Sequence, residues 1–231
     1  MNRLVQTVTS EEDMDQLLSV LENPIRRRIL ERLSQETHYP LQLSKELGVS
    51  QQAIMKHLKV MEDKGIVESF EEPSTSGGPT RKCYRITRRA TVRIDMTPSS
   101  FRAKMSELSP EDVPSPDYSK LVDDYNYIPA EEKQQRLRAL SRMVNEIDRE
   151  MGEMELRRRR LMSFRDRLIA DANHIIAEIN DDYMKRQVLY VLVGGRATTI
   201  DEISDKLDIR LKVLQEMMKD MEDYMYLVET K

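Results

Sequence analysis

Side chains that can hydrogen-bond to nucleic-acid bases gather in one short segment, residues 50–64, with the sequence SQQAIMKHLKVMEDK. Glutamine can pair with adenine through two hydrogen bonds, and lysine can reach a guanine edge or a phosphate. Two stripes recur along the segment at helical spacing, one of polar Gln52, Lys56 and Lys59 and one of apolar Ile54, Leu58 and Met61. The pattern predicts an amphipathic helix that buries the second stripe and presents the first.

The ends of this segment, and the residues before it, indicate a larger motif. Ser50 is a favourable N-cap, and Gly65 suits a left-handed C-cap. A shorter helical segment, residues 41–47, precedes it across a tight Gly48-Val49 connection. Two helices joined in this way are typical of a helix-turn-helix.

The residues that follow predict a β-hairpin. Segments 66–70 and 81–87 flank the turn-rich run EEPSTSGGPT, and a further strand is expected at 91–96. A helix-turn-helix followed by a hairpin is a winged helix. Arg81 and Lys82 would then lie on the wing, where they can hold a phosphate backbone.

The expected DNA contacts fall into two groups. Base contacts are predicted for Gln51, Gln52, Lys56 and His57, and backbone contacts for Ser50, Lys59, Thr80, Arg81 and Lys82. The alternative is a solvated polar face, which is what most exposed lysines and glutamines form. The helix-turn-helix context favours DNA.

The net charge of −4 over 231 residues is unevenly distributed. Residues 1–105 carry 17 Lys+Arg and 14 Asp+Glu, a net charge of +3, whereas residues 106–180 carry 12 and 16 and residues 181–231 carry 8 and 11. The positive excess therefore lies with the predicted winged helix. Local charge, rather than the total, is what faces phosphates.

Composition narrows the class of protein. With 34% charged and 5% aromatic residues, a helix-rich globular protein is expected. No apolar run approaches membrane-spanning length and the N-terminus lacks a signal-peptide layout, so a cytoplasmic location and no membrane partner are expected. The single cysteine, Cys83, excludes an internal disulfide and a cysteine-based metal cluster. No nucleophile, acid–base pair or phosphate loop stands at a useful spacing, so no enzymatic activity is expected.

Two helices are expected before the helix-turn-helix. Residues 10–23 carry an apolar stripe with Ser10 as a candidate cap, and Pro24 fits the first turn of the next helix. Three consecutive arginines, residues 26–28, stand near the beginning of that helix. They could contact the DNA backbone or pair with glutamates within the chain, and the sequence leaves both open.

Three runs of residues carry a family resemblance: NPIRRRILERL, LSKELGVSQQAIMKHLKVMEDKGIV and GPTRKCYRIT. They resemble the ArsR-type winged-helix transcription regulators. The later runs ATVRIDMTPSSF and GGRATTIDEISDKL look like the archaeal sulfur-response (SurR) group of these proteins. The resemblance implies DNA binding, and it places His57 where the family has a recognition-helix histidine, near DNA or on the helix flank.

The departures from the family concern its sensors. The segment LQLSKEL lacks the cysteines of arsenic-sensing members, and His38, His57 and His174 are too scattered for a zinc site. Gln35 and His38 stand where the sulfur-response group would have its Cys-x-x-Cys pair. No metal, cofactor or thiol switch is therefore expected.

The longest regular pattern is a heptad repeat at residues 131–180, after an irregular proline-containing connector at 106–130. It predicts a coiled-coil helix of about 45 to 50 residues, roughly 70 Å long, whose simplest partner is a second copy. The predicted dimer contacts are Leu137, Leu140, Val144, Ile147, Met151, Met154, Leu161, Leu168, Ala172, Ile175 and Ile179.

Two a positions of the repeat are not apolar. Arg158 and Arg165 would cost stability there but could fix the register by pairing with Glu153, Glu155 or Asp166. The run of four arginines at 157–160 is assigned to the seam and its sides rather than to nucleic acid.

The last fifty residues repeat the first domain in outline. Thr199 and Glu202 form a candidate capping box, and the apolar positions of the helix after it match those of residues 50–64 at a constant offset. The matching residues are Leu214, Met218 and Met221, and the outward ones are Lys212, Glu216, Lys219 and Asp223. A glutamate in place of Lys56 repels phosphate, so this unit is expected to pack on the coiled coil, bind a protein or sense a ligand. Its wing is reduced to residues 226–229.

Together these patterns predict a mainly α fold with small β wings. Its domains are a winged helix at 1–105, a linker at 106–130, a dimerisation helix at 131–180 and a degenerate winged helix at 181–231. The expected function is a homodimeric, sequence-specific transcription regulator on palindromic double-stranded DNA, with a protein or small-molecule effector as a further possible partner. The alternative is a protein–protein interaction scaffold, which would bind promoter DNA no more tightly than random duplex.

Overall fold

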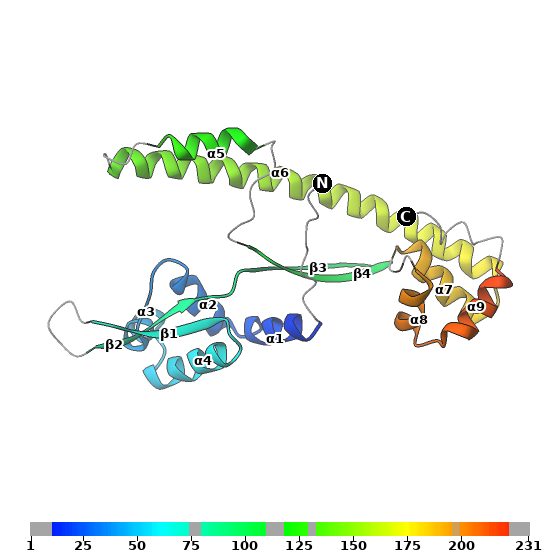
Figure 1. Cartoon of the computed structure of the whole chain (residues 1–231), viewed down its shortest axis with the longest axis horizontal. Helices are drawn as coiled ribbons and strands as arrows, with labels where there is room; N and C mark the ends of the chain where they lie inside the picture. Colours follow the sequence, from blue (N-terminus) through cyan, green and yellow to red (C-terminus); the bar gives the residue numbers. More distant parts are fainter. Residues whose placement is uncertain are drawn as a thin grey trace. The chain divides into compact units, whose positions relative to one another are not determined.

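The chain forms two compact units in a computed structural model (Figure 1). The structure describes residues 11–73, 80–109, 118–128, 133–195, 197 and 199–221. The first unit comprises Met1–Ile94 with Ala103–Val113, and the second comprises Asp95–Arg102 with Pro114–Lys231. Ser10, the candidate cap of the first helix, lies outside the described residues.

The first unit begins with four helices, which are α1 (Glu11–Leu21), α2 (Pro24–Leu33), α3 (Pro40–Leu47) and α4 (Gln51–Asp63). Pro24 stands at the start of α2 as predicted, and the side chain of Asn23 caps that helix by accepting from the backbone N–H groups of Ile25 and Arg26. The helices enclose one core, with Val20, Ile29, Leu43, Ile54, Leu58 and Met61 fully buried.

Two small sheets follow the helices. Strands β1 (Val67–Glu72) and β2 (Arg81–Ile86) pair antiparallel, with Val67 opposite Ile86 and Glu72 opposite Arg81. The predicted hairpin is therefore confirmed, although residues 74–79 at its tip lie outside the described residues. The expected strand at 91–96 is also confirmed as β3 (Ala90–Thr97), which pairs with β4 (Ser100–Glu107), a strand that the sequence analysis missed.

The second unit is helical, with α5 (Ser119–Asn126), α6 (Lys133–Ile179), α7 (Tyr183–Val193), α8 (Ile200–Leu207) and α9 (Leu211–Lys219). The long helix was predicted at 131–180, and α6 spans 47 residues of that range. The connector expected to be irregular at 106–130 contains α5, so that prediction was wrong for these eight residues. A helix this short carries only two turns of periodicity, which the flanking prolines obscured.

The tip of the β3–β4 hairpin belongs to the second unit and is held on α6 by side-chain hydrogen bonds. Asp166 of α6 accepts from the Thr97 hydroxyl at 2.5 Å and from the Ser99 backbone N–H at 3.1 Å. Arg165 donates to the Ser100 hydroxyl at 3.2 Å and to the carbonyl of Gly194 at 2.6 Å. These contacts tie the hairpin tip and the end of α7 to one face of α6.

Arg158, the other basic a position of the heptad repeat, is used in the same way. Its guanidinium binds the carboxylate of Asp95 on the hairpin tip, and it lies 3.5 Å from Glu155 one turn earlier on α6. Both arginines are thus engaged within the protomer. Their place in the heptad follows from this packing, because a guanidinium can reach across to a strand where an aliphatic side chain cannot.

The last three helices enclose a second core, built around Val188, Leu189, Ile203, Leu214 and Met218. Thr199 and Glu202 form the predicted capping box at the start of α8. Asp208 ends α8 in the left-handed conformation with φ of 51°, as Gly48 ends α3 with φ of 66°. The expected wing at residues 226–229 lies outside the described residues.

A pair of glycine substitutions tests the turn between α3 and α4. An added Cβ would meet no atom within 4 Å at Gly48 or at Gly152 in α6, so the backbone alone decides the outcome. Gly48→Ala must place an L side chain at positive φ and should cost about 1–2 kcal/mol. Gly152→Ala lies inside a helix and should stabilise by roughly 0.5–1 kcal/mol.

Thermal and urea unfolding of both variants measure these changes. Opposite shifts of the two variants are expected. A neutral Gly48→Ala would contradict the left-handed geometry of the turn.

Candidate nucleic-acid interface

The helix α4 is positioned by its neighbours in the first unit. Gly48 ends α3 in the left-handed conformation, and the N–H of Val49 donates to the Ser44 carbonyl at 3.2 Å. The chain then turns into α4, whose first turn is capped by the Ser50 hydroxyl accepting from the Ala53 N–H at 3.3 Å. The predicted N-cap is confirmed, and Gly65 follows the helix with φ of 64° as expected.

The face of α4 opposite the core presents a continuous set of exposed side chains. They are Gln51, Gln52, Met55, Lys56 and Lys59. The structure therefore brings together the polar stripe predicted from the sequence. Met55, which is 41% exposed, was missed because only polar side chains were sought on this face. On this face its thioether could contact a thymine methyl group.

Lys59 is paired within its own helix. Its ammonium lies 2.5 Å from the carboxylate of Asp63, one turn further on. The hydrogen bond to Asp63 and its charge raise the pKa of Lys59, so the side chain remains a cation. To bind a phosphate, the Lys59 ammonium would have to leave the Asp63 carboxylate oxygen for a phosphate oxygen.

His57 occupies the flank of α4 rather than its exposed face. It is half-buried, and one residue of helical rotation, about 100°, separates it from Lys56. Burial lowers the pKa of His57, and the nearby charges of Arg26 and Lys56 lower it further. At neutral pH the imidazole is therefore a hydrogen-bonding group without a charge.

The wing places its cations beside aromatic rings. The Arg81 guanidinium lies 5.0 Å from the ring centre of Tyr39, and the Lys82 ammonium lies 5.4 Å from that of Tyr84. Both cations are exposed, as is Thr80 at the start of the strand. Across the ladder, Glu72 faces Arg81 and Glu71 faces Lys82, which reduces the net positive charge of the wing.

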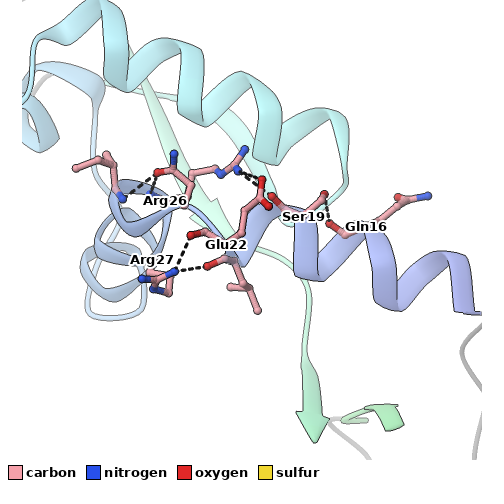
Figure 2. A network of polar contacts seen from close by, with 8 residues as sticks. Gln16, Ser19, Glu22, Arg26 and Arg27 are labelled. Atoms are coloured by element: carbon pink, nitrogen blue, oxygen red, sulfur yellow. Dashed lines mark hydrogen bonds and ion pairs between the residues drawn. The ribbon is translucent and has the colours of Figure 1, made fainter. Parts of the chain in front are cut away.

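The three arginines at the start of α2 are engaged within the chain, and Figure 2 shows the contacts of Arg26 and Arg27. Arg26 donates to the Ser19 carbonyl at 2.7 Å and lies 3.6 Å from the Glu22 carboxylate. Arg27 donates to the carbonyls of Leu21 and Glu22 at 2.5 and 3.0 Å. Arg28 donates to the carbonyl of Leu47 at the end of α3. Of the two roles left open by the sequence, these contacts support the intramolecular one, because the arginines satisfy carbonyls at helix ends.

His38 and Cys83 are structural in the described residues. His38 is 2% exposed, forms a β-bridge with Tyr84, and directs its ring nitrogens at the Glu36 carbonyl and the Glu46 carboxylate. Cys83 is buried in β2, and burial together with Glu72 raises the pKa of its thiol. Among the residues that the structure describes, no group of His, Cys, Asp and Glu could hold a metal ion.

The predicted dimer residues lie along α6. Most of them are exposed, from Leu137 at 69% to Ile179 at 49%, while Leu140 and Ala172 are half-buried. On α9, Lys212, Glu216 and Lys219 are exposed as expected, and Asp223 lies outside the described residues. Within the described parts of the chain, no helix is long and apolar enough to cross a membrane.

Comparison with known proteins identifies the class of the first unit. Residues 21–69 match a helix-turn-helix domain model. These residues run from the end of α1 to the first strand of the wing, so the match covers α2, α3 and α4 with the turn that joins them. The helix-turn-helix predicted from the sequence is confirmed. No curated protein matches the chain.

Three solved structures show partial similarity. An ArsR family transcriptional regulator is 26% identical over 35% of this chain and 77% of its own, with a TM-score of 0.29. A transcriptional regulator of the MarR family from Enterococcus faecalis V583 is 24% identical over 38% of this chain and 76% of its own, with a TM-score of 0.29. An ArsR-like transcriptional regulator from Rhodococcus sp. RHA1 is 21% identical over 63% and 89%, with a TM-score of 0.28.

Substituting His57 tests its neutral state. Because its pKa is lowered in the folded protein, the unfolded chain binds this proton first as the pH falls through the ordinary value of 6.5. The contribution of neutral His57 to the free energy of unfolding is therefore fully present above that pH and is lost below it. When the pH is lowered from about 7.5 to about 5.5, the melting temperature of His57→Gln should fall by less than that of the wild type. Equal losses in the two proteins would contradict the assignment.

Proposed function

We propose that this protein is a sequence-specific DNA-binding transcription regulator. The observation that carries the proposal is the exposed face of α4 in a matched helix-turn-helix domain. Gln51, Gln52 and Lys56 supply donors and acceptors suited to base edges in the major groove. Because the opposite face of α4 is buried, these side chains have a rigid support.

The contacts divide between base recognition and positioning. Gln51, Gln52 and Lys56 are assigned to bases, together with a neutral His57 where the groove reaches the helix flank. Ser50, Lys59, Thr80, Arg81 and Lys82 are assigned to the phosphate backbone. Stacking of Arg81 on Tyr39 limits the motion of its guanidinium and so lowers the entropy cost of holding a phosphate.

The regulator acts as a homodimer joined through α6. The exposed apolar positions of that helix support this part of the proposal, because a single helix would leave them in water. Two α4 helices related by a two-fold axis would enter successive major grooves about 34–36 Å apart. The operator is then an imperfect palindrome.

Within the ArsR type, we place the chain nearest the sulfur-response group but with a different signal. Gln35 is exposed and His38 is buried at the positions where that group would carry its two cysteines, so a dithiol cannot form there. The helices α7, α8 and α9 are proposed as a degenerate winged helix that receives a protein or small-molecule effector. The exposed Glu216 on α9 disfavours phosphate contact by this unit.

Reversing the charge of Lys56 tests the docking of α4. Lys56→Glu should abolish operator binding in a gel shift, because a carboxylate would face the phosphates and base acceptors of the groove. Circular dichroism and molecular mass should be unchanged, since Lys56 is exposed. The operator is obtained by selecting bound sequences from random DNA.

A matched control makes the same charge change on α9. Lys219 is exposed near the end of that helix, so Lys219→Glu alters net charge equally and should retain binding. Retained binding by Lys56→Glu would overturn the docking. Wild-type affinity no higher for selected than for random duplex would favour the interaction-scaffold alternative.

Removing a wing cation tests the division between base and backbone contacts. Lys82→Ala should weaken binding to all sequences alike, because a phosphate contact carries no sequence information. The slope of log affinity against log salt should become shallower by about 1 for each protomer. Fluorescence anisotropy titrations over a range of salt concentrations measure both effects. An unchanged slope would remove Lys82 from the interface.

A further inference from the structure

An apolar groove runs between α5 and the first half of α6 in the second unit. Its volume is about 700 Å³, and Figure 1 shows α5 lying along this part of α6. On one side it is lined by Leu121, Val122 and Tyr125 of α5 and by Tyr118, the residue before that helix. The walls from α6 include Leu140, Val144, Ile147, Met151 and Met154. The helix α5 therefore covers one side of the α6 stripe and leaves the rest open.

The apolar stripe of α6 is exposed in both halves of the helix, but it is unbroken only in the first half. The a positions Leu137, Val144 and Met151 are 69%, 55% and 56% exposed. In the second half, the a positions Arg158 and Arg165 are held by the hairpin tip within the protomer. Residues 137–154 are therefore the longest stretch of α6 in which every a and d position is apolar.

The charges of this half distinguish the two possible directions of a partner helix. Residues 133–142 carry four basic and no acidic side chains, whereas residues 146–155 carry five acidic and one basic. In a parallel pair, the basic segment would lie beside the partner's basic segment and the acidic segment beside the partner's acidic segment, so each would repel its copy. In an antiparallel pair, Arg136 and Arg138 of one copy come level with Glu155 and Glu153 of the other.

The apolar positions match in the same antiparallel arrangement. Antiparallel coiled coils pair an a position of one helix with a d position of the other. With Leu137 level with Met154, the next layers pair Leu140 with Met151 and Val144 with Ile147. The two-fold axis then repeats the same three layers on its other side, so all six a and d positions of residues 137–154 find a partner.

We infer that a second copy of this chain docks antiparallel in the groove, so that α5 and the first half of α6 from each copy form a four-helix dimer core. The inference rests on the proposed homodimer. It adds that the two α6 helices run antiparallel, that Leu137 lies level with Met154 of the partner, and that α5 takes part in the interface. Tyr125 of α5 and Tyr118, which precedes that helix, then border the partner's α6. The second half of α6 extends beyond the dimer core in both copies.

Cysteine cross-linking tests the direction and register together. Leu137→Cys and Met154→Cys are prepared singly and combined, at positions exposed enough to leave the fold intact. In the proposed dimer, each single variant holds its two thiols about 25 Å apart along the axis, too far for a disulfide. In the double variant, the cysteine at position 137 of one copy lies beside the cysteine at position 154 of the other copy. The two cysteines of a single copy remain about 25 Å apart along their helix.

The expected result is a covalent dimer from the double variant under mild oxidation, and from a mixture of the two single variants, but from neither single variant alone. Leu161→Cys serves as a control beyond the core and should not cross-link. The wild type, with Cys83 buried, should also remain uncross-linked.

Three results would overturn the inference. Cross-linking of a single variant with itself would show a parallel seam. The other two are no cross-linking of the double variant and a monomeric mass of the wild type by light scattering. No DNA is present in these measurements. Failure of operator binding in the α4 experiments therefore leaves this result standing, and failure here leaves DNA recognition by each winged helix to be judged separately.

Discussion

The complete burial of one stripe of α4 is the constraint on which the proposed DNA interface depends. Ile54, Leu58 and Met61 are 0% exposed in the core of the first unit. Because successive residues are rotated by about 100° around a helix, any turn of α4 about its axis would lift these side chains into water at about 2 kcal/mol each. The orientation of Gln52 and Lys56 therefore follows from the packing behind them.

Much of the positive charge of the first unit is used inside the chain. The arginines of α2 bind carbonyls at the ends of α1 and α3, Lys59 pairs with Asp63, and the wing cations face glutamates across the ladder. A helix-turn-helix needs its helices held at a fixed angle, and charged hydrogen bonds to helix ends provide this without enlarging a small core. Lys56 stays exposed on the face of α4 that carries Gln51 and Gln52, which makes that residue the centre of the proposed contact.

The helix α6 meets different neighbours in its two halves. In its second half the hairpin tip and α7 pack on the side of the stripe where Ile169 and Ile176 are buried, while the d positions Leu161, Leu168 and Ile175 stay exposed. In its first half the stripe borders α5 and stays open. A heptad repeat in a straight helix drifts by about 20° per repeat, so different neighbours can share one periodic pattern. Periodicity alone therefore indicates that a face is apolar without indicating what covers it.

Local patterns in the sequence were sufficient for the helix-turn-helix, the caps at Ser50, Gly65 and Thr199, the wing strands and the extent of α6, because periodicity and capping act between residues a few positions apart. Only the tertiary structure decided that Arg26 binds the Ser19 carbonyl, that Arg158 binds Asp95 and that Arg165 binds Ser100. It also decided the exposure of Met55 and revealed β4 and α5. A charged side chain has the same sequence signature whether it meets solvent, a carbonyl or a phosphate. The choice among these depends on which distant segments folding brings within a few ångströms of it.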